Sequence, residues 1–230
     1  MSAPLGLPRR HHRVTDSTSD VARALAAAGA PHGTLVTAGE QRAGRGRQGR
    51  TWSAPSGRAL LMSLVLRDWP GPLLPLTAAV AVADVVGPAA AIKWPNDVLL
   101  GGRKVAGILA EGDAQQDWAV LGIGVNVALR EHDVPAELRA RAGTLGLQPA
   151  AIEPLLADLL HALAARLCQT APTLLAAYRM RDALRGSRVR WARGEGIADG
   201  IDEAGRLLVA GPGGARTALD AGEVHLLAGP

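Results

Sequence analysis

Apolar residues recur at helical spacing in four stretches of the chain and at strand spacing in several others. The predicted helices are a segment that follows Asp16 and ends near Gly29, then Leu73–Val86, Ala151–Cys168 and Pro172–Leu184. The predicted strands before residue 130 are Thr34–Ala38, Ala59–Leu66, Val98–Leu100, Lys104–Glu111 and Trp118–Val127. Residues 39–57 are rich in Gly, Arg and Ser and predict a long loop, and residues 130–149 are irregular.

The pattern changes after Gly186, where short apolar runs are separated by glycine-containing turns. The predicted strands there are Val189–Trp191, Gly196–Ile201, Leu207–Ala210, Arg216–Leu219 and Val224–Leu227. So many short strands in about forty residues are typical of a small barrel. The chain is therefore predicted to be an α+β protein, with a flexible leader over 1–13, a mixed-sheet domain packed with helices over 14–185 and a small C-terminal β-barrel over 186–230.

The composition is that of a globular protein and excludes several classes. Hydrophobic residues make up 48% of the 230 positions, and no run is long and apolar enough to cross a bilayer. The basic residues near the N-terminus have no apolar segment behind them, which argues against a secretory signal. The single cysteine, Cys168, excludes an internal disulfide and fits a reducing compartment, so the cytoplasm is the expected location.

Charged and polar residues are distributed unevenly. The net charge is +4, and arginines crowd into the glycine-rich segment 42–50. The chain contains two lysines and two asparagines, and all four fall in one stretch, as Lys93, Asn96, Lys104 and Asn126. Because Lys and Arg differ in shape and hydration, this clustering indicates a specific chemistry, with chance clustering as the alternative.

The glycine–arginine segment Gly44–Arg50, followed by Trp52, is the first candidate for chemistry. Backbone amides and guanidinium groups in such a segment can approach an anion together. The segment is expected to be mobile when empty and ordered by an anionic ligand. The alternatives are a solvated basic loop and an arginine–glycine contact to nucleic acid. Such contacts usually lie in low-complexity tails, whereas this segment lies inside a globular pattern.

The segment Lys93–Asp97 presents a cation, an amide and a carboxylate around Pro95, which fixes a turn. Lys93 could pair with phosphate, and Asp97 could hold a cation, a base or a metal-bound water. Taken alone, these residues fit a simple strand–turn corner capped by Asp97 somewhat better than a binding site.

Two apolar strands carry glycines at positions where strands normally have side chains. Lys104 heads the first, which contains Gly107, and the second contains Gly122, Gly124 and Asn126. Glycine weakens a strand unless something must approach the backbone closely. Such strands build a concave pocket for a flat, mostly apolar ligand, and the alternative is core packing beside β-bulges.

The residues Asp16–Ser19 precede the first helix and are expected to cap it, a role that is compatible with ligand binding. The sequence has no His–Cys metal spacing, no P-loop and no dinucleotide fingerprint. Cys168 lies in a helical pattern and is expected to be packed rather than nucleophilic.

Taken in order, these segments resemble the biotin protein ligase family. The matching residues are Asp16–Thr18, Gln41 with Gly44–Arg50 and Trp52, Lys93–Asp97, Arg103–Leu109 and Gly122–Asn126. The resemblance is strong over residues 14–127. It extends more weakly to the end, through Gly200–Asp202 and the glycine-turn strands, which look like the family's small C-terminal SH3-like barrel.

The resemblance implies a two-step ligase reaction that uses biotin, ATP and Mg²⁺. The carboxylate of biotin would attack the α-phosphorus of ATP, giving biotinoyl-5′-AMP and pyrophosphate. A lysine of a biotin carboxyl carrier protein would then attack the activated carbonyl and release AMP. Mg²⁺ would enter with ATP rather than at a metal site of the protein. The physics agrees, because preplaced cations offset the repulsion between two anions and a closed loop protects a mixed anhydride from water.

The resemblance also implies the residues of the site. Those expected to bind biotin are Ser17, Thr18, Ser19, Gln41, Gly44, Arg45, Gly46, Arg47, Lys104, Gly107, Gly122 and Gly124. Those expected to bind ATP or the adenylate are Arg47, Arg50, Trp52, Lys93, Asn96, Asp97, Lys104 and Asn126. The expected catalytic residues are Lys104, Arg45 and Asp97, of which Lys104 and Arg45 would lie where the carboxylate meets the phosphate.

Departures from the family and rival functions limit this interpretation. Ser19 stands where the family commonly has Asn, which leaves one contact to biotin open. The residues before Asp16 are too few for the winged-helix DNA-binding domain of bifunctional members, so no repressor role is expected. A lipoyl ligase is a rival, but its Arg-Arg-x-Thr-Gly-Gly-Gly signature is absent. A basic nucleic-acid-binding module would give no reason for Lys104 and the glycine-bearing strands.

The expected partner is therefore the carrier protein or domain of a biotin-dependent carboxylase. No specific nucleic acid and no membrane is expected as a partner. The sequence leaves a homodimer open.

Overall fold

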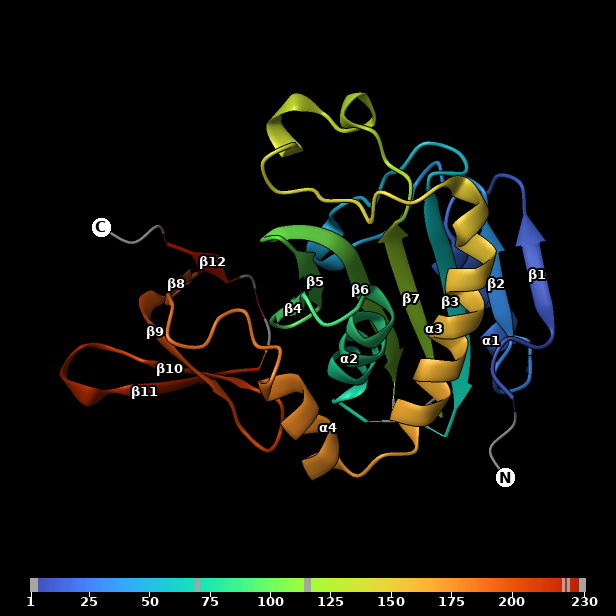
Figure 1. The fold of residues 1–230 in the computed structure, drawn as a ribbon. Helices are drawn as coiled ribbons and strands as arrows, with labels where there is room; N and C mark the ends of the chain where they lie inside the picture. The colour runs from blue at the N-terminus through green and yellow to red at the C-terminus, as the bar shows by residue number, and fades with distance from the viewer. Residues whose placement is uncertain (1–3, 69–70, 114–116, 221, 223, 228–230) are drawn as a thin grey trace.

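The computed structural model describes residues 4–68, 71–113, 117–220, 222 and 224–227. In chain order (Figure 1), its helices, strands and 3-10 turns are β1 Arg9–His12, α1 Thr18–Ala27, β2 Leu35–Ala38, η1 Arg47–Gly49, β3 Ala59–Arg67, α2 Leu74–Val86, β4 Ala90–Lys93, β5 Asp97–Leu100, β6 Arg103–Asp113, β7 Trp118–Asn126, η3 Glu131–Asp133, η4 Ala136–Leu138, η5 Pro149–Ala151, α3 Ile152–Leu167, α4 Ala171–Arg179, β8 Arg188–Trp191, β9 Gly194–Ile201, β10 Leu207–Ala210, η6 Pro212–Gly214, β11 Arg216–Leu219 and β12 His225–Leu226.

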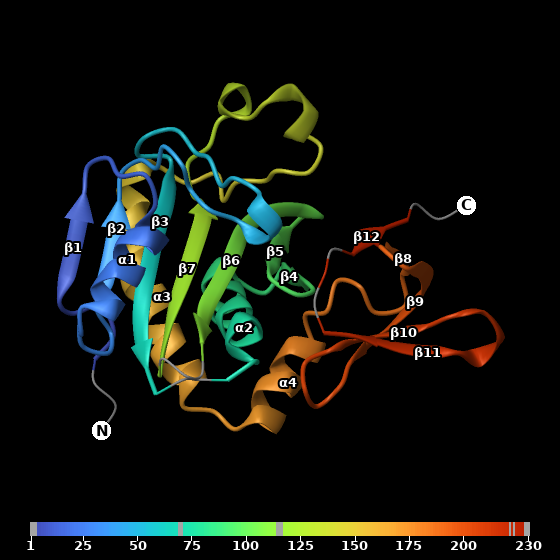
Figure 2. The ribbon, with the colours of Figure 1, turned by 180° about the vertical axis from the view of Figure 1, so that it is seen from behind.

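Seven strands form one mixed sheet in the order β1-β2-β3-β7-β6-β5-β4. Strand β1 runs parallel to β2, and the other neighbours are antiparallel. Helices α2 and α3 cover one face of this sheet, and α1 covers part of the other (Figures 1 and 2). The segment after β2 crosses in front of β6 and β7 on the α1 side, as Figure 2 shows. The predicted mixed sheet packed with helices is confirmed.

Alternate residues of the central strands serve two separate cores. On β3, Leu60 and Met62 belong to the large core beneath α2 and α3, whereas Val65 packs with Ala22 and Ala26 of α1. Because successive strand residues point to opposite faces, a strand covered on both faces must be apolar throughout. This explains the nearly unbroken apolar run of β3, and it means that a polar residue in that run has a local reason.

The C-terminal strands form an antiparallel sheet in the order β11-β10-β9-β8-β12. The predicted β-module after Gly186 is confirmed, but no pairing among the described residues joins β11 to β12, so the sheet is open rather than a closed barrel. Its buried residues continue the large core of the first domain. The indole of Trp94 donates a hydrogen bond to the carbonyl of Gly205 at 3.0 Å, which ties the β4–β5 turn to the C-terminal module.

The prediction of a flexible leader over 1–13 is wrong for part of that segment. Residues 9–12 form β1, whose Arg9 lies opposite Leu35 in a parallel pairing with β2. Arg9 also donates to both oxygens of Glu153 on α3, at 2.7 Å each. An exposed edge strand needs no apolar alternation, so its sequence carries little strand signal.

Two smaller expectations also fail. The last predicted helix ends at Arg179 rather than Leu184, because the following residues bond to β4 through Ile92, which donates to the carbonyl of Arg181 and accepts from the amide of Ala183. Cys168 is exposed at the end of α3 rather than packed. Among the described residues, no helix combines the length and apolar character needed to span a membrane.

Candidate active site

The face of the sheet on which α1 packs is partly uncovered, and this uncovered part carries an open pocket. The strand register builds its floor, because residues that lie opposite one another share a face of the sheet. Gly107 of β6 lies opposite Gly124 of β7, which in turn lies opposite Leu61 of β3. In the next row, Gly122 lies opposite Ser63. The glycines therefore leave bare backbone at the centre of the floor.

Trp52 lies directly on this bare backbone. A Cβ atom added to Gly107 would lie 2.8 Å from Cζ3 of Trp52, and one added to Gly124 would lie 2.6 Å from its Nε1. Both distances are shorter than ordinary carbon contacts, so only glycine allows the indole to rest here. The Lys104 ammonium lies 5.4 Å from the ring centroid, within the range of a cation–π contact.

A β-bulge turns Lys104 toward the pocket. In the ladder between β5 and β6, Val98 pairs with Ala106 and Leu99 with Lys104, so β6 has one extra residue between these pairs. In the regular part of β6, odd-numbered residues such as Gly107 face the pocket, and the bulge brings Lys104 to the same face. Its Nζ lies 2.6 Å from Oδ1 of Asp97, and both side chains are partly exposed.

Residues 44–52 form a small hairpin that lies across the pocket. Arg45 and Thr51 are bridged, and the Trp52 amide donates to the carbonyl of Gly44 at 2.9 Å. At the tip, Gln48 and Gly49 have φ values of 56° and 72°, in the left-handed region that turns the chain. The guanidinium of Arg47 donates to Oδ1 of Asn96 at 3.1 Å, so the hairpin reaches the β4–β5 turn.

The N-terminus of α1 forms the second side of the pocket. Ser17 caps the helix, as predicted, by accepting from the amide of Asp20 at 3.4 Å. The amide and hydroxyl of Thr18 both donate to Oε1 of Gln41, at 2.7 and 2.9 Å. Ser63 on β3 donates to the Thr18 hydroxyl at 2.9 Å, and the Ser19 hydroxyl lies 3.1 Å from that of Ser63.

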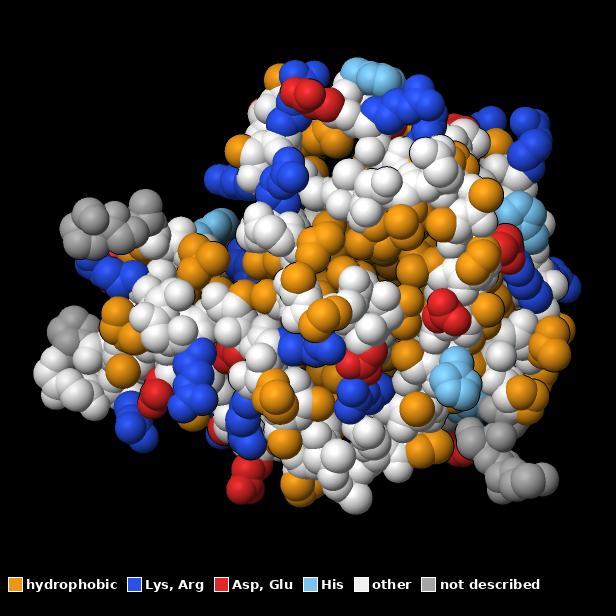
Figure 3. Space-filling model, in the orientation of Figure 1, with side chains coloured by type: hydrophobic (Ala, Val, Ile, Leu, Met, Phe, Trp, Pro, Cys, Tyr) orange, Lys and Arg blue, Asp and Glu red, His pale blue; other side chains and the backbone are white. Residues whose placement is uncertain are grey.

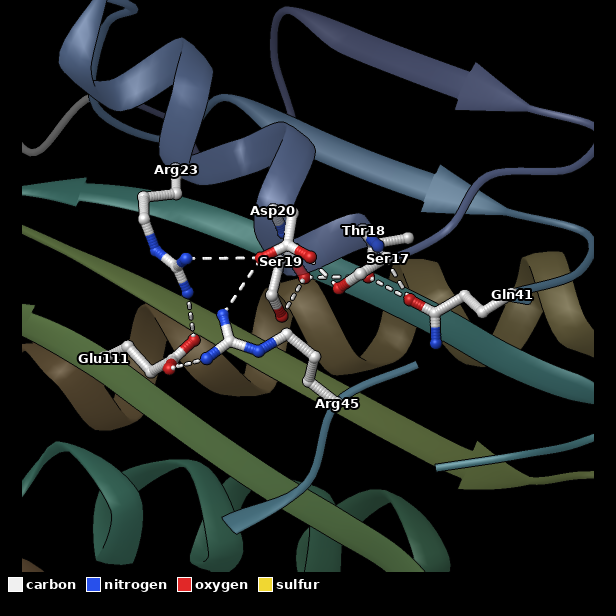
Figure 4. A network of polar contacts seen from close by, with 9 residues as sticks. Ser17, Thr18, Ser19, Asp20, Arg23, Gln41, Arg45 and Glu111 are labelled. Atoms are coloured by element: carbon white, nitrogen blue, oxygen red, sulfur yellow. Dashed lines mark hydrogen bonds and ion pairs between the residues drawn. The ribbon is translucent and has the colours of Figure 1, made fainter. Parts of the chain in front are cut away.

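A second polar network joins α1, the hairpin and β6 (Figure 4). Arg45 donates to Asp20 at 2.9 Å and to Glu111 at 2.7 Å. Arg23, one turn along α1, donates to the same two carboxylates at 3.2 and 2.7 Å. The network thus contains two guanidinium groups and two carboxylates.

Most of the predicted site residues come together in this pocket. Its lining includes Thr18, Ser19, Gln41, Arg45, Gly46, Arg47, Arg50, Trp52, Asn96, Asp97, Lys104, Gly107, Gly122 and Gly124. Those lining residues carry four cationic side chains and one carboxylate, a balance that suits an anionic ligand.

Four predicted residues are not among those that line the pocket. Ser17 is the helix cap, and Lys93 ends β4. Gly44 allows the Trp52 carbonyl and the Gln41 side chain to approach its backbone. Asn126 is buried and donates to the carbonyl of Gly143 at 2.9 Å.

Sequence reasoning missed part of the pocket. The missed lining residues are Thr51, Leu61, Met62, Ile108, Leu109 and Ile123. It also missed Ser63 and the carboxylates of Asp20 and Glu111, which contact lining residues. Ser63 could have been found, because it is the polar residue inside the apolar run of β3.

A second hollow is lined by Arg103 of β6 and by residues between 129 and 144. Its lining includes Arg103, Arg130, Arg139 and Gly143, and Figure 3 shows basic side chains gathered over the 130–149 segment. The Gly143 amide donates to the Lys104 carbonyl at 2.7 Å, which holds this segment against the end of β6. No cluster of three or more His, Cys, Asp or Glu side chains within the described ranges could hold a metal ion.

Two family models match separate parts of the chain, one in the first domain and one in the C-terminal module. Residues 12–127 match the Biotin/lipoate A/B protein ligase family, and residues 186–227 match the Biotin protein ligase C terminal domain. The chain is a member of the biotin protein ligase branch of this family.

Individual relatives agree with the family assignment. The chain is 38% identical over 234 residues to the biotin--[acetyl-CoA-carboxylase] ligase of Mycobacterium tuberculosis, covering 92% of this chain and 86% of the relative. It is 41% identical over 236 residues to the ligase of the same name from Paracoccus denitrificans, covering 91% of this chain and 97% of the relative. The chain spans less than half the length of the bifunctional ligase/repressor proteins of two Bacillus species, 45% and 44%, at 45% and 46% identity.

The fold also matches a solved structure. The biotin protein ligase from Aquifex aeolicus, in complex with biotin and ATP, superimposes with a TM-score of 0.81 at 26% identity, covering 95% of this chain and 98% of that one.

Proposed function

We propose that this chain is a biotin ligase that activates biotin with ATP and transfers it to a lysine of a biotin carboxyl carrier protein. The observation that carries the proposal is the pocket itself, in which Lys104, the arginine hairpin and the polar start of α1 surround a glycine floor on which Trp52 packs. The names of the relatives and of the Aquifex complex point to the same substrates.

The first step would join two anions at the Lys104 end of the floor. A carboxylate oxygen of biotin forms a bond to the α-phosphorus of ATP, and the bond from that phosphorus to pyrophosphate breaks. We assign to Lys104 and Arg47 the neutralisation of the charges that meet there, a contribution on the order of 3 kcal/mol for each such group in a site shielded from water. In the second step, the carrier's lysine amine attacks the biotinoyl carbonyl, loses a proton and displaces AMP.

The polar cluster at the start of α1 is suited to the uncharged end of biotin. Thr18, Ser19 and Gln41 present hydroxyl and amide groups at the end of the floor where the second glycine row lies. A Cβ atom at Gly122 would lie 2.7 Å from the Ser19 hydroxyl, so that glycine makes room for the Ser19 side chain. We infer that these groups bind the ureido ring by hydrogen bonds.

Mg²⁺ would arrive with the phosphates of ATP, since the donor set of the pocket does not form a cage of its own. Asp97 is the carboxylate among the lining residues, and the side-chain oxygen of Asn96 lies beside it in sequence. These two residues would hold the Mg²⁺ ion, which would supply charge neutralisation of the phosphates. The second hollow, whose lining includes Arg103, Arg130 and Arg139, would take the remainder of the nucleotide. A reaction that consumes ATP is in keeping with the cytoplasm.

Biotin-dependent exchange of labelled pyrophosphate into ATP tests the proposal without a carrier protein. Lys104→Met should abolish this exchange while the thermal unfolding midpoint stays close to wild type, because Lys104 is partly exposed. Arg216→Met is a matched control, since Arg216 is an exposed cation on β11. Exchange at the wild-type rate in Lys104→Met would remove Lys104 from the reaction. Salt-dependent binding to generic DNA in place of any exchange would favour the nucleic-acid alternative.

A further inference from the structure

Arg45 connects the base of the hairpin 44–52 to two separate elements. One guanidinium nitrogen donates to Asp20 in the first turn of α1, and the other donates to Glu111 on β6. Both partners are fixed by the sheet, because Glu111 lies opposite Val120 in the β6–β7 ladder and α1 packs on the same face. Figure 4 shows the guanidinium lying between the two carboxylates.

The backbone next to Arg45 forms a wall of the pocket. Gly46 lines the pocket and its amide donates to the carbonyl of Arg50 at 2.7 Å, which closes the tip of the hairpin. Trp52, on the return strand of the hairpin, rests on the glycine floor. The hairpin is therefore fixed at its base by an ionic contact on one strand and by ring packing on the other.

The charges around Arg45 are already balanced. Two carboxylates face two guanidinium groups in a closed network, since Arg23 donates to the same Asp20 and Glu111. A guanidinium shared between two carboxylates attracts a further anion less strongly than one without such partners. The side chain is thus better suited to hold the hairpin than to bind a reacting carboxylate.

We propose that Arg45 is a positioning residue of the biotin site, whose guanidinium is held by Asp20 and Glu111 and thereby sets the distance between the hairpin backbone and the floor of the pocket. This inference rests on the proposed function and gives Arg45 a different role in it from direct contact with the reacting anions. Glu111 should contribute more than Asp20, because its side chain is 26% exposed whereas that of Asp20 is 48% exposed.

The test compares variants on both sides of the contact in biotin-dependent pyrophosphate exchange. Arg45→Met and the double variant Asp20→Ala/Glu111→Ala should each raise the KM for biotin by about tenfold, the effect expected from losing charge-assisted hydrogen bonds at a partly exposed site. The kcat should change by less than about twofold, because the groups that meet the reacting atoms remain in place. Arg45→Lys, which can reach one carboxylate at a time, should give an intermediate KM.

Combining the variants supplies the stronger evidence. The triple variant, which combines Arg45→Met with Asp20→Ala and Glu111→Ala, should have the same KM as Arg45→Met. Once Arg45 has lost its guanidinium, removing the two carboxylates takes away no further contact. Arg23→Met is the matched control, because Arg23 contacts the same carboxylates but does not belong to the hairpin, and its KM should stay close to wild type. Without any ligand, trypsin should cut after Arg47 and Arg50 faster in Arg45→Met and in the double variant than in wild type.

Direct contact with the reacting anions predicts a different pattern. Removing the carboxylates would then release Arg45 and keep or lower the KM, whereas Arg45→Met would reduce kcat. That pattern, or unchanged trypsin cleavage in both variants, would overturn the positioning role. A wild-type chain that gives no exchange at all would instead overturn the proposed function, and the trypsin comparison, which needs no ligand, keeps the two failures distinguishable.

Discussion

The glycine floor makes the sharpest prediction, and Gly124→Ala is the smallest change that tests it. Gly124 lies in β7 between Gly107 and Leu61 of the neighbouring strands, and the Trp52 ring covers it. A methyl group at this position points into the pocket and leaves the opposite face of the sheet unchanged. The variant should therefore alter the site with little effect on the core.

The expected magnitude follows from the distances. The new Cβ would lie 2.6 Å from Nε1 and 2.8 Å from Cζ2 of Trp52. Because carbon atoms pack best at about 3.5–4.0 Å, the ring would have to withdraw by roughly 1 Å. Trp52 belongs to the hairpin, and the Lys104 ammonium lies over the Trp52 ring. A shift of the ring would therefore displace both the hairpin and the Lys104 ammonium. A displacement of about 1 Å in a reacting geometry can cost on the order of 100-fold in rate.

We therefore expect kcat/KM for biotin in pyrophosphate exchange to fall by about 100-fold in Gly124→Ala, with a change in the free energy of unfolding of about 1 kcal/mol or less. Gly211→Ala is a matched control, because its new Cβ would meet only Ala215, at an ordinary 3.6 Å from the carbonyl oxygen. The reasoning is refuted if Gly124→Ala keeps the wild-type kcat/KM while its unfolding midpoint shows that the protein is folded.

Three further predictions concern Asp182, the hairpin and Trp94. Burial raises the pKa of Asp182, so the folded state binds the proton of this carboxyl more tightly than the unfolded state does. Stability therefore falls as the pH rises from the ordinary carboxyl pKa to the raised pKa of the folded state. Asp182→Asn should thus raise the unfolding midpoint more at about pH 7.5 than at about pH 4, as calorimetry would measure, and an equal shift at both would contradict this. Biotin plus ATP should slow tryptic cleavage within 44–50, and unchanged cleavage would argue against closure of the hairpin. Trp94→Phe removes the donor to Gly205 and should lower the free energy of unfolding by about 1–2 kcal/mol, measured by denaturant titration; a wild-type value would mean that this bond does not stabilise the protein.

The elements that the sequence predicts well are those whose own residues carry the pattern. Helix α2 is apolar on nearly every side and packs against both the sheet and α3, and β3 is apolar because both of its faces are buried. Strand β1 escapes prediction, since its residues are basic and its pairing partner β2 comes more than twenty residues later. The open edge between β11 and β12 is likewise a matter of distant pairing, which local patterns do not specify.

The candidate site, too, could be predicted only in part from the sequence. The identities of Lys104, Asp97 and the floor glycines could be predicted from the family's motifs, but the orientation of Lys104 depends on a bulge that the sequence does not reveal. Asn126 follows the glycines of β7 in sequence, yet its side chain turns to Gly143 and holds the neighbouring segment instead of lining the pocket. The partners of Arg45 lie 25 and 66 residues away, so their contact is a property of the folded sheet.

The two halves of the pocket are held by different kinds of interaction, and under the proposed reaction this difference has a purpose. The floor and Lys104 belong to strands buried on their other face, whose displacement would disturb the core. The hairpin is instead attached through partly exposed charge pairs at Arg45 and a half-buried Trp52, contacts worth about 1 kcal/mol or less for each ion pair. A ligase must enclose a hydrolysable anhydride and afterwards admit a lysine of a second protein to the same carbon. A rigid floor with a weakly attached wall meets both requirements, because the wall can open at low cost while Lys104 stays in place at the floor.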